Sequence, residues 1–181
     1  MTSPFSNPAG RAPAQASAYI RSILELLGDR DPLEVQAGLA DALRDAVRGL
    51  TPAQLKAPEA PGKWSVAQTV AHLADSEVTF SWRIRMVLAQ DRPTITGFDQ
   101  DAWSARLGGA YPDVGSAIQQ IAILRGTNLS LLRSLAPTDW DRVGLHEERG
   151  EESVRHMTRL YAGHDLVHLR QIARIRQAIG G

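Results

Sequence analysis

Four long stretches of this chain repeat their apolar residues every three to four positions, which is the spacing of one face of an α-helix. They cover about residues 31–50, 65–90, 113–137 and 151–178, and connections with proline, glycine or charged residues separate them. The sequence shows neither an internal repeat nor a run of alternating β-branched residues that would form a strand of consequence. The pattern therefore predicts an all-α protein built as a four-helix bundle.

A short additional helix is predicted before the bundle. Apolar residues from Ala18 to Leu27 have helical spacing, and Gly28 follows them as a helix end. The preceding residues, 1–14, have no such pattern and are expected to form a loose tail. Residues 15–181 are then expected to form one domain, because a chain of this length supports one core more readily than two.

Composition excludes several classes of function. Twenty basic and twenty acidic residues cancel, so the charge footprint of a nucleic-acid binder is missing and no nucleic-acid partner is expected. The chain has no cysteine, which excludes disulfides, zinc–thiolate sites and a cysteine nucleophile. No stretch reads as a signal peptide or approaches the ~20 apolar residues of a membrane span. We therefore expect a soluble cytoplasmic protein with no membrane partner.

A histidine pair, His164 and His168, lies at the centre of the apolar stripe of the last helix. Residues four apart share one helix face, so the two imidazoles can hold one metal ion. Burying an imidazole without a partner costs about 1–3 kcal/mol, and two on adjacent turns require an explanation. Spacing alone leaves two explanations open: a metal site, or hydrogen bonds within the core.

The other histidines give weaker signals. His72 lies at the edge of the apolar stripe of the 65–90 helix, where it is a metal ligand or a half-buried structural residue. His146 stands in a charged loop, and His156 lies beside Arg155 and off the inward stripe of the last helix. We interpret His146 and His156 as solvated side chains.

Two segments together resemble a known family. Residues 64–68 (Trp-Ser-Val-Ala-Gln) and 71–77 (Ala-His-Leu-Ala-Asp-Ser-Glu) resemble its first motif, and residues 162–172 (Ala-Gly-His-Asp-Leu-Val-His-Leu-Arg-Gln-Ile) resemble its C-terminal motif. The family is the DinB-like or YfiT-like superfamily of metalloenzymes. The resemblance extends over most of the chain, from about Leu27 to Ile179.

The resemblance implies an up-down-down-up bundle that is often a homodimer. It also implies that His72, His164 and His168 hold one divalent ion, zinc or nickel, and that water completes the coordination of this ion. Family members act as metal-dependent hydrolases or as transferases that activate a low-molecular-weight thiol. The implied partner is a small-molecule substrate, with or without such a thiol, and any thiol must be a cosubstrate because the chain has no cysteine.

Five further residues are candidates for the surroundings of the metal. Gln171 lies one turn beyond His168 and is expected to orient an imidazole, whereas Asp165 could do so only across a groove between helices. Glu77 is either a base or acceptor beside the metal or the partner of an arginine such as Arg125 or Arg170. Asn128 bonds within the core or lines the pocket. Trp103, with Phe98 and Tyr111, either roofs the pocket or packs on the end of the bundle.

Two function classes remain open on the sequence. The intact set of three histidines favours a metal-dependent enzyme, a hydrolase or a thiol-dependent S-transferase. The lack of a clear general acid or base on the inward stripe favours a non-catalytic bundle, metal-binding or metal-free, with a structural or stress-response role.

Overall fold

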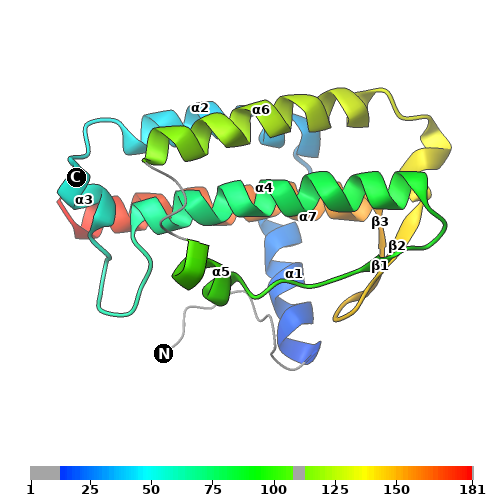
Figure 1. Ribbon diagram of the computed structural model, residues 1–181, viewed down its shortest axis with the longest axis horizontal. Helices are drawn as coiled ribbons and strands as arrows, with labels where there is room; N and C mark the ends of the chain where they lie inside the picture. The colour runs from blue at the N-terminus through cyan, green and yellow to red at the C-terminus, as the bar shows by residue number, and fades with distance from the viewer. Residues whose placement is uncertain (1–12, 108–112, 181) are drawn as a thin grey trace.

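A bundle of four helices forms the centre of the molecule in the computed structural model, which describes residues 13–107 and 113–180 (Figure 1). Its members are α2 (Pro32–Val47), α4 (Val66–Ala89), α6 (Val114–Arg133) and α7 (Val154–Ala178). The prediction of an all-α four-helix bundle is therefore confirmed. Most of the expected tail lies outside the described residues, and the first helix begins at Pro13, inside the segment 1–14 that was expected to be tail.

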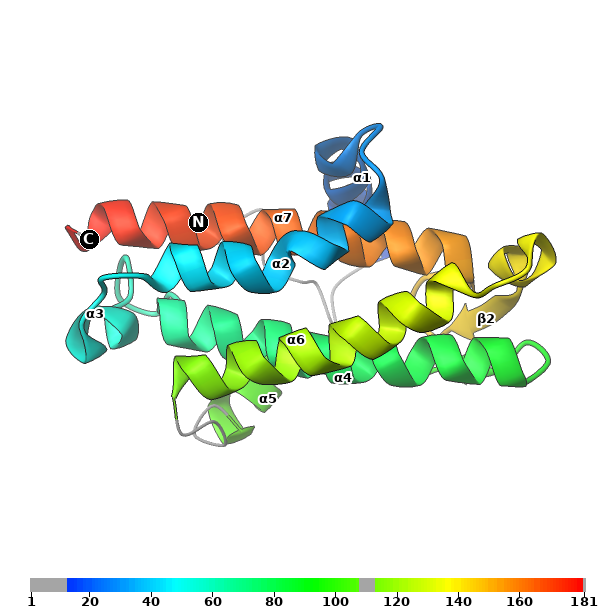
Figure 2. The same ribbon diagram turned by 90° about the horizontal axis from the view of Figure 1, so that it is seen from above.

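The helix directions have the expected up-down-down-up order. Figure 2 shows α2 and α7 running one way along the bundle, while α4 and α6 run the opposite way. Both α2 and α4 pack against α6 and against α7, so the parallel helices α4 and α6 are neighbours. Two parallel neighbours cannot be joined by a tight turn, which is why the connection between residues 90 and 113 is long.

Side-chain caps fix where the bundle helices begin. The Asp31 side chain accepts a hydrogen bond from the backbone of Leu33, and a capping box joins Ser65 and Gln68. Ser153 caps α7, so that helix begins at Val154, three residues later than predicted. Residues 151–153, which were predicted to be the start of this helix, belong to a strand instead.

The apolar faces of these helices meet in two buried clusters along the bundle. One lies toward the start of α4 and includes Leu39, Leu43, Val70, Leu73, Ile121, Ile172 and Ile175. The other lies toward the end of α4 and includes Phe80, Ile84, Val87, Leu132 and Met157. Burial of this apolar surface is the main term that stabilises the fold.

A small sheet covers the end of the bundle where α4 ends and α7 begins (Figure 1). Strand β1 (Thr94–Ile95) pairs in parallel with β2 (Val143–His146), which pairs antiparallel with β3 (Gly150–Ser153). A Cβ atom at Gly144 would lie 2.6 Å from Ile95 Cδ1 and 2.8 Å from Val87 Cγ2, so only glycine allows β2 this close. The sequence prediction missed these strands.

Short helices complete the connections between the larger elements. They are α3 (Pro52–Lys56), α5 (Gln100–Leu107) and the 3₁₀ helix η1 (Pro137–Asp141). All three lie in or beside the connections that were predicted between the long helices. None of the described helices is long and apolar enough to cross a membrane.

The additional N-terminal helix, α1 (Pro13–Leu27), crosses α7 outside the bundle (Figures 1 and 2). The crossing point is Gly163, where a Cβ atom would lie 2.5 Å from the backbone oxygen of Ile23. Backbone cannot yield as a flexible side chain can, so any larger residue at 163 would push α1 away. This close approach places α1 beside His164.

Candidate metal centre

Three histidines meet in the groove between α4 and α7. The Nε2 atom of His164 lies 3.1 Å from that of His72 and 3.0 Å from that of His168. One ligand atom from each ring can be chosen so that all three lie within 4.8 Å of one another. The structure therefore brings the distant His72 to the pair that spacing had singled out on α7.

The hydrogen-bond geometry fits a cation better than it fits three imidazoles alone. The Oε1 atom of Gln171 lies 2.8 Å from Nδ1 of His168, so Nδ1 carries the proton and Nε2 presents its lone pair. The single Nε2 of His164 faces two other Nε2 atoms, and one proton cannot satisfy both contacts. Nitrogen ligands of a tetrahedral zinc ion at ~2.0–2.1 Å lie roughly 3.3 Å from one another. The Nε2 atom of His164 lies at nearly this distance, 3.1 and 3.0 Å, from the Nε2 atoms of His72 and His168.

Burial keeps the three rings neutral. Burial, together with the charge that the neighbouring imidazoles would carry, lowers the pKa of His72 and of His164 well below the ordinary 6.5. Burial lowers the pKa of His168 to about 4, against the opposing effect of its hydrogen bond to Gln171. The neutral imidazole is the form that ligates metal, so the donor set is ready at pH 7.

Aromatic rings enclose His72. The Trp64 ring lies 5.0 Å from the His72 ring, and the Phe98 ring stacks at 6.4 Å. Trp103 packs against Phe98 at 4.8 Å, so it supports the roof rather than forming it. Of the three aromatic residues proposed as a roof, Phe98 borders the pocket, Trp103 lies behind it, and Tyr111 lies outside the described residues.

A pocket opens beside His72 and His164, on the side away from the bundle core. Its apolar wall comes from α1 and α7, and its other walls come from α4, the segment after β1 and the β2–β3 hairpin. The residues lining it are Tyr19, Ile20, Ile23, His72, Ser76, Arg83, Gly97, Phe98, His146, Glu148, Arg149, Leu160, Tyr161 and His164. A small molecule in this pocket would lie against two of the three candidate ligands.

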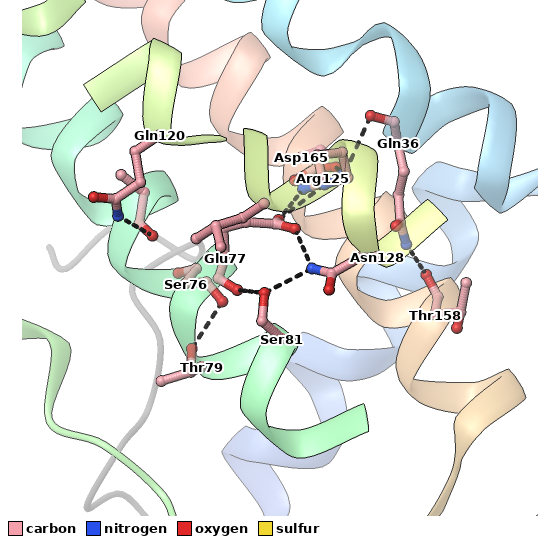
Figure 3. Close-up of polar contacts among 12 residues, drawn as sticks. Gln36, Ser76, Glu77, Thr79, Ser81, Gln120, Arg125, Asn128, Thr158 and Asp165 are labelled. Atoms are coloured by element: carbon pink, nitrogen blue, oxygen red, sulfur yellow. Dashed lines mark hydrogen bonds and ion pairs between the residues drawn. The ribbon is translucent and has the colours of Figure 1, made fainter. Parts of the chain in front are cut away.

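Glu77 and Asp165 face the interior of the bundle, where both bind Arg125 of α6 (Figure 3). Asn128 donates to the second oxygen of Glu77 at 2.7 Å and also bonds Ser81. Burial opposes the charge of Arg125, but the charges of Asp165 and Glu77 outweigh it and raise its pKa. Of the two alternatives for Glu77, the structure shows the partner of an arginine, Arg125. Of the two for Asn128, it shows hydrogen bonds within the core.

His146 departs from its prediction. We interpreted it as a solvated loop residue, yet it is 2% exposed, on β2, and lines the pocket. The error follows from the missed hairpin, because alternation along β2 turns His146 inward while its neighbours face outward. His156 is half-buried and lies outside the histidine cluster.

Arg83 and Tyr161 are pocket residues that sequence reasoning did not nominate. Arg83 is buried on α4, and Tyr161 lies on the inward stripe of α7. The available signal for Arg83 was its helical position beside the apolar stripe of α4, next to Ile84 and four residues before Val87.

The sequence model of the DinB superfamily matches residues 38–172. The chain belongs to this superfamily. The resemblance inferred from the two histidine motifs is thereby confirmed, and the matched span includes all three histidines.

Relatives in this superfamily carry names that refer to metals. The chain is 32% identical over 144 residues to "Putative metal-dependent hydrolase GK0616" of Geobacillus kaustophilus, covering 79% of this chain and 81% of that protein. It is 30% identical over 139 residues to "Putative metal-dependent hydrolase YfiT" of Bacillus subtilis, covering 76% and 78%.

A solved structure of YfiT from Bacillus subtilis has the same fold. It superimposes with a TM-score of 0.77 at 27% identity, over 82% of this chain and 86% of that one. It is described as "a probable metal-dependent hydrolase with an unusual four-helix bundle topology". Together with the three-histidine cluster, these names support a divalent metal site.

Proposed function

We propose that this protein is a metal-dependent hydrolase of a small molecule, with one zinc or nickel ion held by His72, His164 and His168. The observation that carries the proposal is the convergence of their ring nitrogens at the wall of a pocket. Three protein ligands leave a coordination position for a reactant, as catalytic sites require. The names of the relatives support hydrolysis.

The chain's own residues would support this chemistry in three ways. A divalent ion in such a site supplies Lewis-acid activation of water or of a substrate carbonyl. Gln171 holds the His168 ring and its proton in place. Phe98 and Trp64 limit the access of bulk water to His72, which strengthens electrostatic interactions inside the pocket.

The same three ligands suit a second reaction, the transfer of a low-molecular-weight thiol. The pocket could hold such a cosubstrate beside the ion, which would favour its thiolate form. Turnover assays separate the two reactions. A hydrolase cleaves ester or amide substrates without added thiol, whereas a transferase consumes an electrophile only when a thiol such as cysteine or glutathione is present.

Metal analysis of protein purified without an affinity tag tests the site itself. We expect about one equivalent of divalent metal per chain, falling below about a tenth in His72→Ala, His164→Ala and His168→Ala. His156→Ala is the matched control, on α7 but outside the cluster. Full metal content in the three variants, with native circular dichroism, would refute the assignment. Stoichiometric metal without turnover on any panel would favour the non-catalytic bundle.

A further inference from the structure

Arg83 is a buried cation without a carboxylate partner among the described residues. Its side chain is 6% exposed and lines the pocket. It donates to the Tyr161 hydroxyl at 3.1 Å and to the backbone oxygen of Thr96 at 2.7 Å. A guanidinium has five N–H donors, and both of these partners are neutral. Burying an uncompensated charge is expensive, so the arrangement calls for an anion.

His146 presents a second free donor to the same pocket. Its Nδ1 accepts a hydrogen bond from the backbone N–H of Glu148 at 3.2 Å, which places the proton of the neutral ring on Nε2. That Nε2 is buried and has no hydrogen-bond partner in the part of the chain that the structure describes. Burial, assisted by the charge of Arg149, lowers the pKa of His146 to about 4, so the ring is neutral at pH 7 and donates only through Nε2–H.

The neighbouring charges leave Arg83 as the cation in excess. Arg149 also lines the pocket, but its guanidinium is paired with buried Glu152 through contacts of 2.6 and 2.8 Å. Glu148 stands at the exposed rim, beside Gly97, and makes no ion pair with Arg83. The inner end of the pocket therefore combines one unpaired positive charge with one unpaired N–H.

Two aromatic residues connect this end of the pocket to the histidine cluster. The Phe98 ring lies 6.4 Å from the His72 ring and 5.9 Å from Cζ of Arg83. The Tyr161 ring lies 6.2 Å from the His164 ring, and its hydroxyl meets Arg83. A molecule lying along these rings would reach the histidines with one end and Arg83 with the other.

We propose that Arg83 and His146 bind an anionic oxygen group of the substrate, a carboxylate or a phosphate, at the end of the pocket away from the three histidines. The inference rests on the proposed function, since it assigns the class of substrate to the same pocket. The substrate is then a small acid whose reacting group lies beside the histidines and whose apolar middle contacts Phe98, Tyr161 and Leu160.

Binding of simple aromatic acids tests the proposal. We would titrate benzoate, phenyl phosphate and neutral benzamide into the full chain, both zinc-loaded and chelator-treated, by calorimetry. The ¹⁵N signal of His146 Nε2 would be followed in histidine-labelled protein. We expect one of the two acids to bind at least tenfold more tightly than benzamide, and to move the His146 signal, in both metal states. The tighter acid identifies carboxylate or phosphate as the preferred group.

Variants separate this site from general electrostatic attraction. Arg83→Gln should weaken binding of the preferred acid at least tenfold, whereas Arg83→Lys should retain part of it. Arg170→Gln is the matched control, because it removes an equal charge from the exposed face of α7 and should leave binding unchanged. If Arg83→Gln does not fold, the preference for an acid over benzamide and the His146 signal in the wild-type chain decide.

Equal binding of benzamide and the acids, or an unmoved His146 signal, would overturn the proposal. So would unchanged binding in a folded Arg83→Gln variant. The chelator-treated arm keeps these outcomes separate from the proposed hydrolase. Acid binding that persists without metal supports the anion site whatever the turnover assays show, and turnover without acid binding would refute the anion site alone.

Discussion

The protein buries two polar clusters close together, and they differ in how their groups are satisfied. In the bundle interior, Arg125 binds both Glu77 and Asp165, and Asn128 takes the remaining oxygen of Glu77. In the α4–α7 groove, three neutral imidazoles face one another, and Nδ1 of His164 has no hydrogen-bond partner among the described residues. Burial raises the same cost in both places. In the interior cluster, ion pairs within the protein offset that cost. In the groove, a bound ligand would have to offset it.

The largest expected effect comes from breaking the interior cluster. Arg125→Met leaves two carboxylates buried without their cation and should lower the free energy of unfolding by about 3–5 kcal/mol. Urea denaturation measures the loss. The matched control is Arg44→Met, which breaks an exposed pair with Asp41 and should cost less than about 1 kcal/mol. Equal losses in the two variants would show that the interior cluster is not a structural unit.

Acid should act in opposite directions on the bundle interior, through Asp165, and on the pocket beside the groove, through His146. The folded pKa of His146 is about 4, below the ordinary 6.5, so its contribution to stability is present above pH 6.5 and is lost as pH falls toward 4. Burial raises the pKa of Asp165 to about 6, so the folded state takes up that proton first and Asp165 favours folding as pH falls below 6. Each effect is on the order of 3 kcal/mol at pH 4.

Urea denaturation of chelator-treated protein between pH 7 and pH 4 measures both effects. His146→Gln should flatten the loss of stability on acidification, and Asp165→Asn should steepen it. Identical pH profiles in both variants and the wild type would refute the assigned shifts.

The bundle could be predicted from the sequence because helical spacing and caps are local signals. The stripe of α4 and the Ser65–Gln68 capping box define that helix without reference to any other part of the chain. The strands could not be predicted in this way. β1 has two residues, and β2 and β3 have four each, too few to show alternation.

The same limit applies to the site. The spacing of His164 and His168 indicates a shared helix face, but no local signal places His72 beside them; that required the family motif. Arg83 and His146 were missed because their burial depends on the missed sheet and on the connection between residues 90 and 113, where Thr96 accepts a hydrogen bond from Arg83. Contacts between segments that are far apart in the sequence determine whether such residues are buried.

A smaller effect is expected from the neighbour that orients His168. Gln171→Leu removes the acceptor of the Nδ1 proton and should weaken metal affinity about 10–100-fold with little loss of stability. Competition with a chromogenic chelator measures the affinity. Gln171→Glu, which keeps an acceptor oxygen, should retain metal. An unchanged affinity in Gln171→Leu would show that this hydrogen bond does not tune the site.

The smallest effect on stability is expected at the outer face of α4, where Trp82 is 65% exposed beside Val78. Trp82→Ser should change the free energy of unfolding by less than about 0.5 kcal/mol. The homodimer implied by the family stays a prediction, and light scattering tests it. A wild-type monomer at all concentrations would refute it, and a dimer lost in Trp82→Ser would place the interface on this face.

The pocket is enclosed partly by the two helices that carry the histidines and partly by three segments outside the bundle. The candidate ligands lie on α4 and α7, and the bundle core fixes how these two helices pack. Helix α1, the segment after β1 and the β2–β3 hairpin supply much of the rest of the wall. Gly163 lets α1 pack directly on α7, so a single helix crossing forms this part of the pocket wall. Changes in these three segments should therefore alter which molecules enter the pocket without moving the three histidines.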